Sequence, residues 1–131
     1  MREIKTYDDL MHLRASEYRD ALMSMRLTEA DREMLRVFWS SHRHEDTAEN
    51  LALAMGWKNY NAWNMKFGQF CGRLAKALGV WTGNKQTASE LDWHIYVACF
   101  CETHDVEAKG HLLLTMRPAL VRAVEMLGIV D

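Results

Sequence analysis

The spacing of apolar residues between positions 60 and 78 constrains this chain more than any other feature. They recur with the 3.6-residue period of an amphipathic helix: Trp63, Phe67, Phe70, Cys71, Leu74 and Leu78. Asn59 precedes the pattern as a helix cap, and Gly79 follows it as a terminator. We therefore predict a helix over 60–78. Within it Gly68 and Gly72 each cost about 1 kcal/mol relative to alanine, which predicts a close helix crossing, with approach of a ligand as the alternative.

The rest of the chain predicts more helices and one β-hairpin. Additional helices are expected at about 7–25, 28–42, 47–55 and 118–127, with a polar connector at 42–46. From Trp93 to Cys101 the apolar residues alternate with period two, and HLLLTM at 111–116 suits a partner strand. A hairpin is therefore predicted at about 93–116.

These elements indicate one domain over residues 1–131. A chain of 49% hydrophobic and 26% charged residues with one proline suits a helix-rich globular protein. Three helices followed by a hairpin is the order of a winged helix-turn-helix. We expect a mainly α fold with a β-hairpin, built as a winged helix-turn-helix-like core with an N-terminal and a C-terminal helix added.

Charge is distributed unevenly along the chain. No acidic residue occurs from Asn50 to Ser89, although the chain has 18 acids and five of its 16 Lys and Arg residues lie there. Lys and Arg neutralise phosphates, and Asn and Gln pair with base edges, so this window predicts contact with nucleic acid. The candidate binding residues are Lys58, Asn61, Asn64, Lys66, Gln69, Arg73, Lys76 and Lys85.

Two observations weigh against that interpretation. The outer face of any amphipathic helix is polar, and the net charge of −2 is unfavourable for tight non-specific DNA binding. The predicted hairpin loop, ETHDVEAKG, is acidic where a wing on a phosphate backbone is usually basic or small. Any contact with DNA, which is the expected nucleic acid, would then depend on the helix at 60–78.

Four short motifs resemble one known family. The residues that carry the resemblance are Thr47, Leu51, Ala52, Gly56 and Trp57; Ala62, Asn64, Phe67 and Gly68; Leu74, Ala75, Leu78 and Gly79; and Met116, Arg117, Pro118, Leu127 and Gly128. The chain resembles a helix-turn-helix-like domain of bacterial restriction-type proteins, where that domain often precedes an HNH nuclease. The resemblance implies a non-catalytic module associated with DNA or with phage defence, here expected to stand alone.

A protein partner is the competing hypothesis. A phage or mobile-element inhibitor, anti-CRISPR-like or anti-restriction, would bind a defence nuclease complex. Its acidic flanks would then occupy a basic nucleic-acid channel, or its basic helix would grip an acidic partner. The acidic residues that motivate it are Asp8, Asp9, Glu17, Glu102, Asp105 and Glu107. A blander alternative is a homodimer formed through the helix at 7–25.

Catalysis, metal binding and a membrane location are not expected. Cys99, Cys101, His104 and His111 include zinc-ligand types, but they lack paired Cys-x₂-Cys spacing, and alternation makes the cysteines core residues. No convergent nucleophile–base motif occurs, so we expect no enzyme activity and no cofactor. The absence of a signal-like or membrane-spanning apolar run predicts a cytoplasmic protein.

Overall fold

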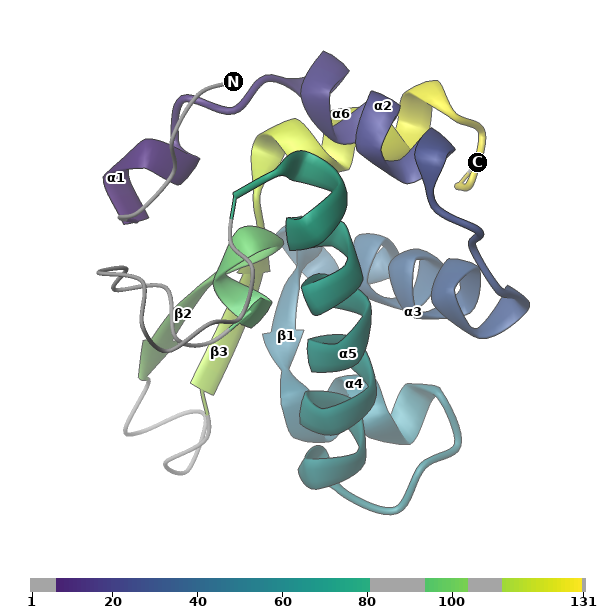
Figure 1. Cartoon of the computed structure of the whole chain (residues 1–131). Helices are drawn as coiled ribbons and strands as arrows, with labels where there is room; N and C mark the ends of the chain where they lie inside the picture. Colours follow the sequence, from purple (N-terminus) through teal and green to yellow (C-terminus); the bar gives the residue numbers. More distant parts are fainter. Residues whose placement is uncertain (1–6, 81–93, 104–111, 131) are drawn as a thin grey trace.

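The computed structural model describes residues 7–80, 94–103 and 112–130, and these form a mainly helical fold with a small antiparallel sheet (Figure 1). The elements in chain order are α1 (Tyr7–Leu10), α2 (Ala15–Ser24), α3 (Glu29–Ser40), the 3₁₀ turn η1 (His42–His44), β1 (Glu45–Thr47), α4 (Ala48–Ala54), α5 (Tyr60–Leu78), the 3₁₀ turn η2 (His94–Val97), β2 (Cys99–Thr103), β3 (Leu112–Met116) and α6 (Pro118–Met126).

The long helix α5 stands at the centre of the arrangement (Figure 1). It contacts α2, α3, α4 and η2, while α2 and α6 pack on each other across its C-terminal end. The sheet lies on one side of α5 and α3 on the other. Three of the helices and the turn η2 therefore meet this one helix.

A row of aromatic rings holds the inner face of α5. Trp63, Phe67 and Phe70 are fully buried, with ring centroids 4.8 Å apart for the first pair and 5.8 Å for the second. Phe38 of α3 meets Phe67 edge-on at 5.6 Å. Burying each ring stabilises the fold by about 1.5–3 kcal/mol, so this row anchors α3 to α5.

The ends of α4 and α5 follow their local sequence signals. The side chain of Asn59 accepts a hydrogen bond from the Ala62 amide at 3.3 Å, and Gly79 ends α5 with φ 71°. Thr47 caps α4 by accepting from the Asn50 amide at 3.2 Å. Since these signals act within four residues, α5 has the predicted bounds and α4 differs from its prediction by one residue at each end.

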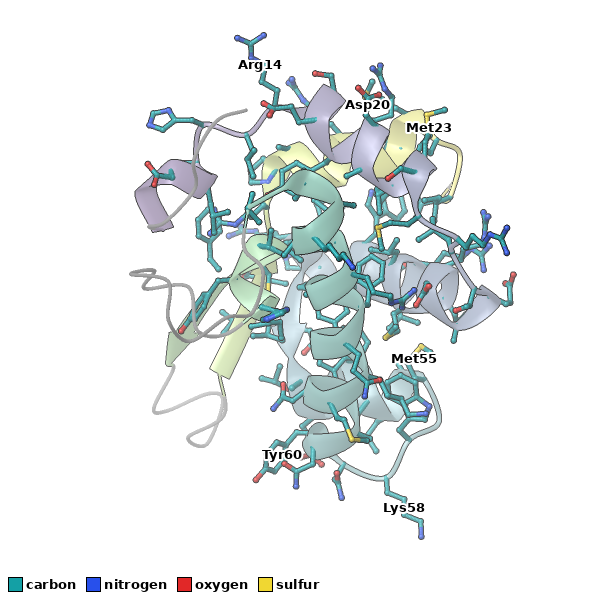
Figure 2. The ribbon with its side chains drawn as sticks, viewed as in Figure 1. Arg14, Asp20, Met23, Met55, Lys58 and Tyr60 are labelled. Atoms are coloured by element: carbon teal, nitrogen blue, oxygen red, sulfur yellow. The ribbon has the colours of Figure 1, made fainter. Side chains whose placement is uncertain are left out.

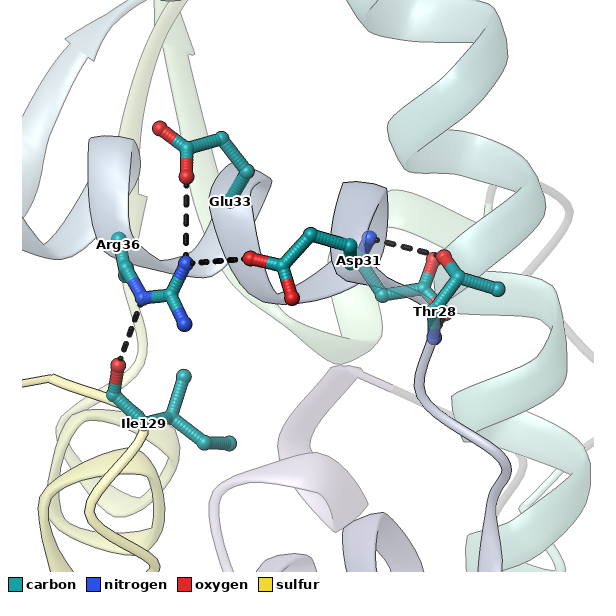
Figure 3. A network of polar contacts seen from close by, with 6 residues as sticks. Thr28, Asp31, Glu33, Arg36 and Ile129 are labelled. Carbon is teal, nitrogen blue, oxygen red and sulfur yellow. Dashed lines mark hydrogen bonds and ion pairs between the residues drawn. The ribbon is translucent and has the colours of Figure 1, made fainter.

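Helix α3 is fixed at its start and tied to the C-terminal segment (Figure 3). Thr28 and Asp31 form a reciprocal capping box, with hydrogen bonds of 2.9 and 3.1 Å. The guanidinium of Arg36 bridges Glu29 and Glu33, and its Nε donates to the carbonyl of Ile129 at 3.0 Å. This network joins α3 to the chain beyond α6.

The sheet contains a strand that the sequence analysis did not predict. Its order is β1-β3-β2, and β1 runs from the end of the expected polar connector into Thr47, the first residue of the predicted helix 47–55. Glu45, Asp46 and Thr47 pair antiparallel with Leu113–Thr115, and Glu45 accepts a hydrogen bond from the Thr115 hydroxyl at 3.0 Å. Because β1 forms through backbone pairing with a strand some 70 residues away, its own sequence carries no apolar signal. The predicted helix 28–42 ends earlier, at Ser40, before the chain turns into this strand.

The predicted continuous helix over 7–25 is wrong, because it is broken between α1 and α2. Leu10 and Leu22 would lie roughly 120° apart on one continuous helix, whereas the break allows both to be buried. Helix α2 restarts where the Arg14 amide donates to the Glu17 carboxylate at 3.1 Å. Met11, in the break between the two helices, is 66% exposed.

The hairpin is confirmed for β2 and β3, but its first strand begins at Cys99 and residues 94–97 form a 3₁₀ turn. Ile95, Val97, Ala98 and Cys99 are all buried, which strict alternation does not allow. The Val97 carbonyl accepts from the Tyr18 hydroxyl at 2.7 Å, and the Tyr96 carbonyl accepts from Arg117 Nε at 2.7 Å. Tyr18 and Arg117 thus supply the hydrogen-bond donors that a neighbouring strand would supply in a sheet. The predicted helix 118–127 is observed as Pro118–Met126.

The two glycines of α5 have different surroundings. A Cβ atom on Gly72 would lie 2.5 Å from Nδ1 of His94, whereas one on Gly68 would have no described atom within 4 Å. The close crossing expected from these glycines is therefore found at Gly72, where η2 passes over α5. Gly68 leaves open space instead.

We expect Gly72→Ala to lower the free energy of unfolding by about 1–3 kcal/mol, because the ring of His94 must shift. Gly68→Ala, the matched control, should raise it by up to about 1 kcal/mol through helix propensity. Urea unfolding of both variants and of Gly72→Ala/His94→Ala measures this. An equal loss for Gly72→Ala with and without His94 would contradict the crossing.

Candidate nucleic-acid interface

The outer face of α5 collects most of the predicted binding residues. Asn61, Lys66, Gln69, Arg73 and Lys76 are all exposed and lie on the side away from the aromatic row. Their spacing along 19 residues follows the same period that buries the opposite face. No acidic residue belongs to α5. The face is therefore a continuous strip of cations and amides.

A shallow groove of about 540 Å³ runs along this strip. Its lining consists of Met65, Gly68, Gln69, Gly72, Arg73, Lys76 and His94. The two glycines form its floor without side chains, and Met65 is 59% exposed at its edge. Gln69, Arg73 and Lys76 place donors along the groove, which suits an elongated polyanion.

Lys66 and Trp57 form a contact at the N-terminal half of the strip. Trp57, in the turn between α4 and α5, is half-buried and packs on Trp63 with ring centroids 6.1 Å apart. The ammonium of Lys66 sits 4.9 Å from the Trp57 ring centroid. This cation–π contact holds the Lys66 side chain against the protein while its charge stays exposed.

Arg73 has a structural partner that the sequence analysis did not identify. Its guanidinium donates to both carboxylate oxygens of Asp31 on α3, at 2.9 and 2.6 Å. Asp31 is 3% exposed and Arg73 47% exposed. Burial opposes ionisation of Asp31, but hydrogen bonds from Arg73 and Thr28 outweigh it and hold its pKa below the ordinary value. The hydrogen bonds between Arg73 and Asp31 also raise the pKa of Arg73.

Three predicted residues lie apart from the strip. Asn64 is half-buried at the opposite edge of α5. Lys58 is exposed in the turn that precedes α5, at the same end of the molecule as Tyr60, the first residue of the helix (Figure 2). Lys85 lies outside the described residues. Within the described residues, the candidate strip therefore comes from α5.

Met65 and His94 were not among the predicted site residues. A helical wheel already places Met65 between Asn61 and Gln69, so periodicity could have identified it. His94 reaches the groove only through the crossing of η2 over α5, which leaves no local signal in the sequence. Burial lowers the pKa of His94, so its ring is neutral at pH 7 and adds no charge to the groove.

The cysteines have core surroundings where they are described. Cys71 and Cys99 are buried, and the Cys99 thiol donates to the Ile95 carbonyl at 3.4 Å. Within the described ranges, no three His, Cys, Asp or Glu side chains gather as a metal site. The remaining candidate zinc ligands lie outside what is described: His104, His111 and the side chain of Cys101.

No family model, curated protein or solved structure matches this chain. None of the helices in the described segments has the length and apolar character needed to cross a bilayer. The chemistry of the α5 strip is therefore the principal guide to function.

We expect the ion pair of Asp31 and Arg73 to contribute about 1–2 kcal/mol of coupling energy, because one partner is half exposed. A double-mutant cycle with Asp31→Asn, Arg73→Gln and the double variant measures it by urea unfolding. Additive effects of the two substitutions would show that the contact contributes nothing.

Acidification should weaken this contact. The lowered pKa of Asp31 means that the unfolded chain takes up a proton at higher pH than the folded chain. The contribution is therefore complete above about pH 4 and is lost as the pH falls below it. Unfolding measured from pH 6 to 2 should show a shallower pH dependence for Asp31→Asn than for the unsubstituted protein. Parallel curves would contradict the assignment.

Proposed function

We propose that this protein is a non-catalytic nucleic-acid-binding module with a winged helix-turn-helix architecture, in which α5 contacts duplex DNA. The observation that carries the proposal is the strip of cations and amides on the outer face of α5, free of acidic residues along the helix. Cations beside amides are the combination that binds phosphates and base edges together.

The topology supports this proposal. The order α3, β1, α4, α5, β2 and β3 contains three helices followed by a hairpin, and the short strand β1 pairs with the last strand of that hairpin. The turn η2, which precedes the hairpin, packs on the third helix, α5, and α4 packs on α5 and on β1. The exposed strip of α5 then has the width of one helix, which the major groove admits.

The cations of the strip differ in their surroundings. Arg73 is bound to Asp31 and would contribute its exposed edge while keeping α5 in position. Lys66 and Lys76 are exposed without an acidic residue on their own helix, and they would neutralise phosphates. Asn61 and Gln69 would lie at base edges or at the backbone.

The link to restriction or phage defence derives from the sequence resemblance at 47–79 and at the C-terminal end. The alternative, an inhibitor of a defence nuclease, was motivated by acidic flanks. Asp105 and Glu107 lie outside the described residues, and the Glu17 carboxylate accepts a hydrogen bond at the start of α2. The basic face of α5 would serve an acidic protein partner as well, but its amides beside cations favour DNA, so DNA binding is the function to test first.

We expect duplex DNA to bind at low salt, with affinity that falls as salt increases. Lys66→Ala/Lys76→Ala should reduce the slope of log affinity against log salt by about 1.8, the effect of losing two phosphate contacts. Fluorescence anisotropy with a labelled duplex at several salt concentrations gives the slope. Arg73 is left unchanged because its loss would leave the buried Asp31 without its partner.

Arg26→Ala is the control, since Arg26 is exposed in the linker between α2 and α3 and does not line the groove along α5. It changes the net charge without touching the strip and should leave the slope within half a unit of the unsubstituted value. Absence of duplex binding at low salt would refute the proposal. So would a slope that the Lys66→Ala/Lys76→Ala variant leaves unchanged.

A further inference from the structure

We propose a second site, independent of α5: the pocket between the starts of α2 and α6 binds a small organic anion that carries an apolar body. This pocket of about 510 Å³ lies among α1, α2, β2 and α6. Its volume falls in the range of small-molecule sites, roughly 300–1,000 Å³. It combines an apolar wall with three arginines, and that combination defines the ligand class.

The apolar wall comes from the first two helices and the sheet. Leu10 and Leu13 are buried side chains that line it, and Tyr18 and Phe100 add ring surface. The Tyr18 hydroxyl donates to the Val97 carbonyl at 2.7 Å, so its position is fixed. Burial raises the pKa of Tyr18 far above its ordinary range, so the hydroxyl carries no negative charge. This wall suits an alkyl chain or an aromatic ring.

Arg117 supplies a buried positive charge to the same pocket. The residue is 4% exposed, its Nε donates to the Tyr96 carbonyl at 2.7 Å, and its guanidinium lies 4.4 Å from the Phe100 ring centroid. These contacts hold the guanidinium in place in the pocket wall. A cation pre-positioned beside apolar surface favours an anionic group that arrives with an apolar body.

Arg14 and Arg122 also line the pocket, and both residues are exposed. Among the described residues that line the pocket, none is acidic. Glu17 lies in the first turn of α2, where its carboxylate accepts from the Arg14 amide at 3.1 Å. The lining is therefore cationic on its polar side and apolar on the other.

Two helix starts border the pocket. Helix α2 begins at Ala15 and α6 at Pro118, and both residues line the pocket. Glu17 offsets the dipole of α2 in its first turn. The first turn of α6 has no acidic residue, and Arg117 before it has no side-chain oxygen to accept from the first-turn amides. The positive end of the α6 dipole thus faces the same space as the three arginines.

This pocket is separate from the α5 strip. The described residues that line the pocket and those that line the groove along α5 have no member in common. Four elements enclose the pocket, so a compact molecule fits it better than a polypeptide segment. The shared chemistry of the ligand is a carboxylate or phosphate on an apolar group of about eight carbons.

Isothermal titration calorimetry with octanoate, octyl phosphate, octanol and inorganic phosphate tests the proposal, each amphiphile being kept below its micelle concentration. We expect one saturable site for octanoate or octyl phosphate, with octanol and inorganic phosphate at least about tenfold weaker. The preference between the two octyl anions identifies the head group. Arg122→Gln and, separately, Arg14→Gln should each weaken binding about tenfold, the loss of one charge-assisted hydrogen bond.

Arg26→Gln is the charge-matched control and should bind like the unsubstituted protein, since Arg26 does not line the pocket. Equal affinity for octanol and octanoate would overturn the anion requirement, and equal affinity for phosphate and octyl phosphate would overturn the apolar one. Binding of a Leu- and Glu-rich peptide without any octyl anion would replace the small ligand with a polypeptide. Retained binding in both arginine variants, with unchanged thermal unfolding, would remove the assigned site.

Discussion

The described fold depends on the inner face of α5. Trp63, Phe67 and Phe70 form a continuous buried row, and Phe38 joins it from α3. Helices α2, α3 and α4 and the turn η2 all pack on this helix. The aromatic rings fix the inner side of α5 in the core. The outer side of the same helix is therefore exposed on a rigid support, and the groove along it is rigid as well. A binding surface on a packed helix is better defined than one on loops.

The parts of the fold that the sequence predicted well are those with local causes. Asn59 and Gly79 act within one turn of helix, and the apolar period between them needs no knowledge of the rest of the chain. This is why α5 has its predicted bounds. No proline or glycine in the sequence marks the break after α1. It arises from the need to bury both Leu10 and Leu22 against the same core, which is a tertiary requirement.

The same distinction explains the candidate site. Periodicity predicted that Lys66, Gln69 and Lys76 share one face, because a helix decides that alone. It could not predict that Arg73 is held by Asp31, 42 residues earlier, since that contact requires α3 to lie beside α5. The sequence has no acidic residue from Asn50 to Ser89. The fold nevertheless places Asp31, from outside this window, at the edge of the strip. Counting charges along the chain misses such partners.

The net charge of −2 and pI near 6.3 therefore say little about the two cationic surfaces. The described acids act largely at helix starts and in ion pairs on other elements: Glu17 in α2, Glu29, Asp31 and Glu33 in α3, and Asp46 before α4. There they stabilise capping amides or pair with arginine, so much of their charge is compensated within the fold. Neither α5 nor α6 has an acid in its first turn. The positive potential of the chain thus gathers along the outer face of α5 and around the start of α6, while its negative total is distributed over the elements that support them.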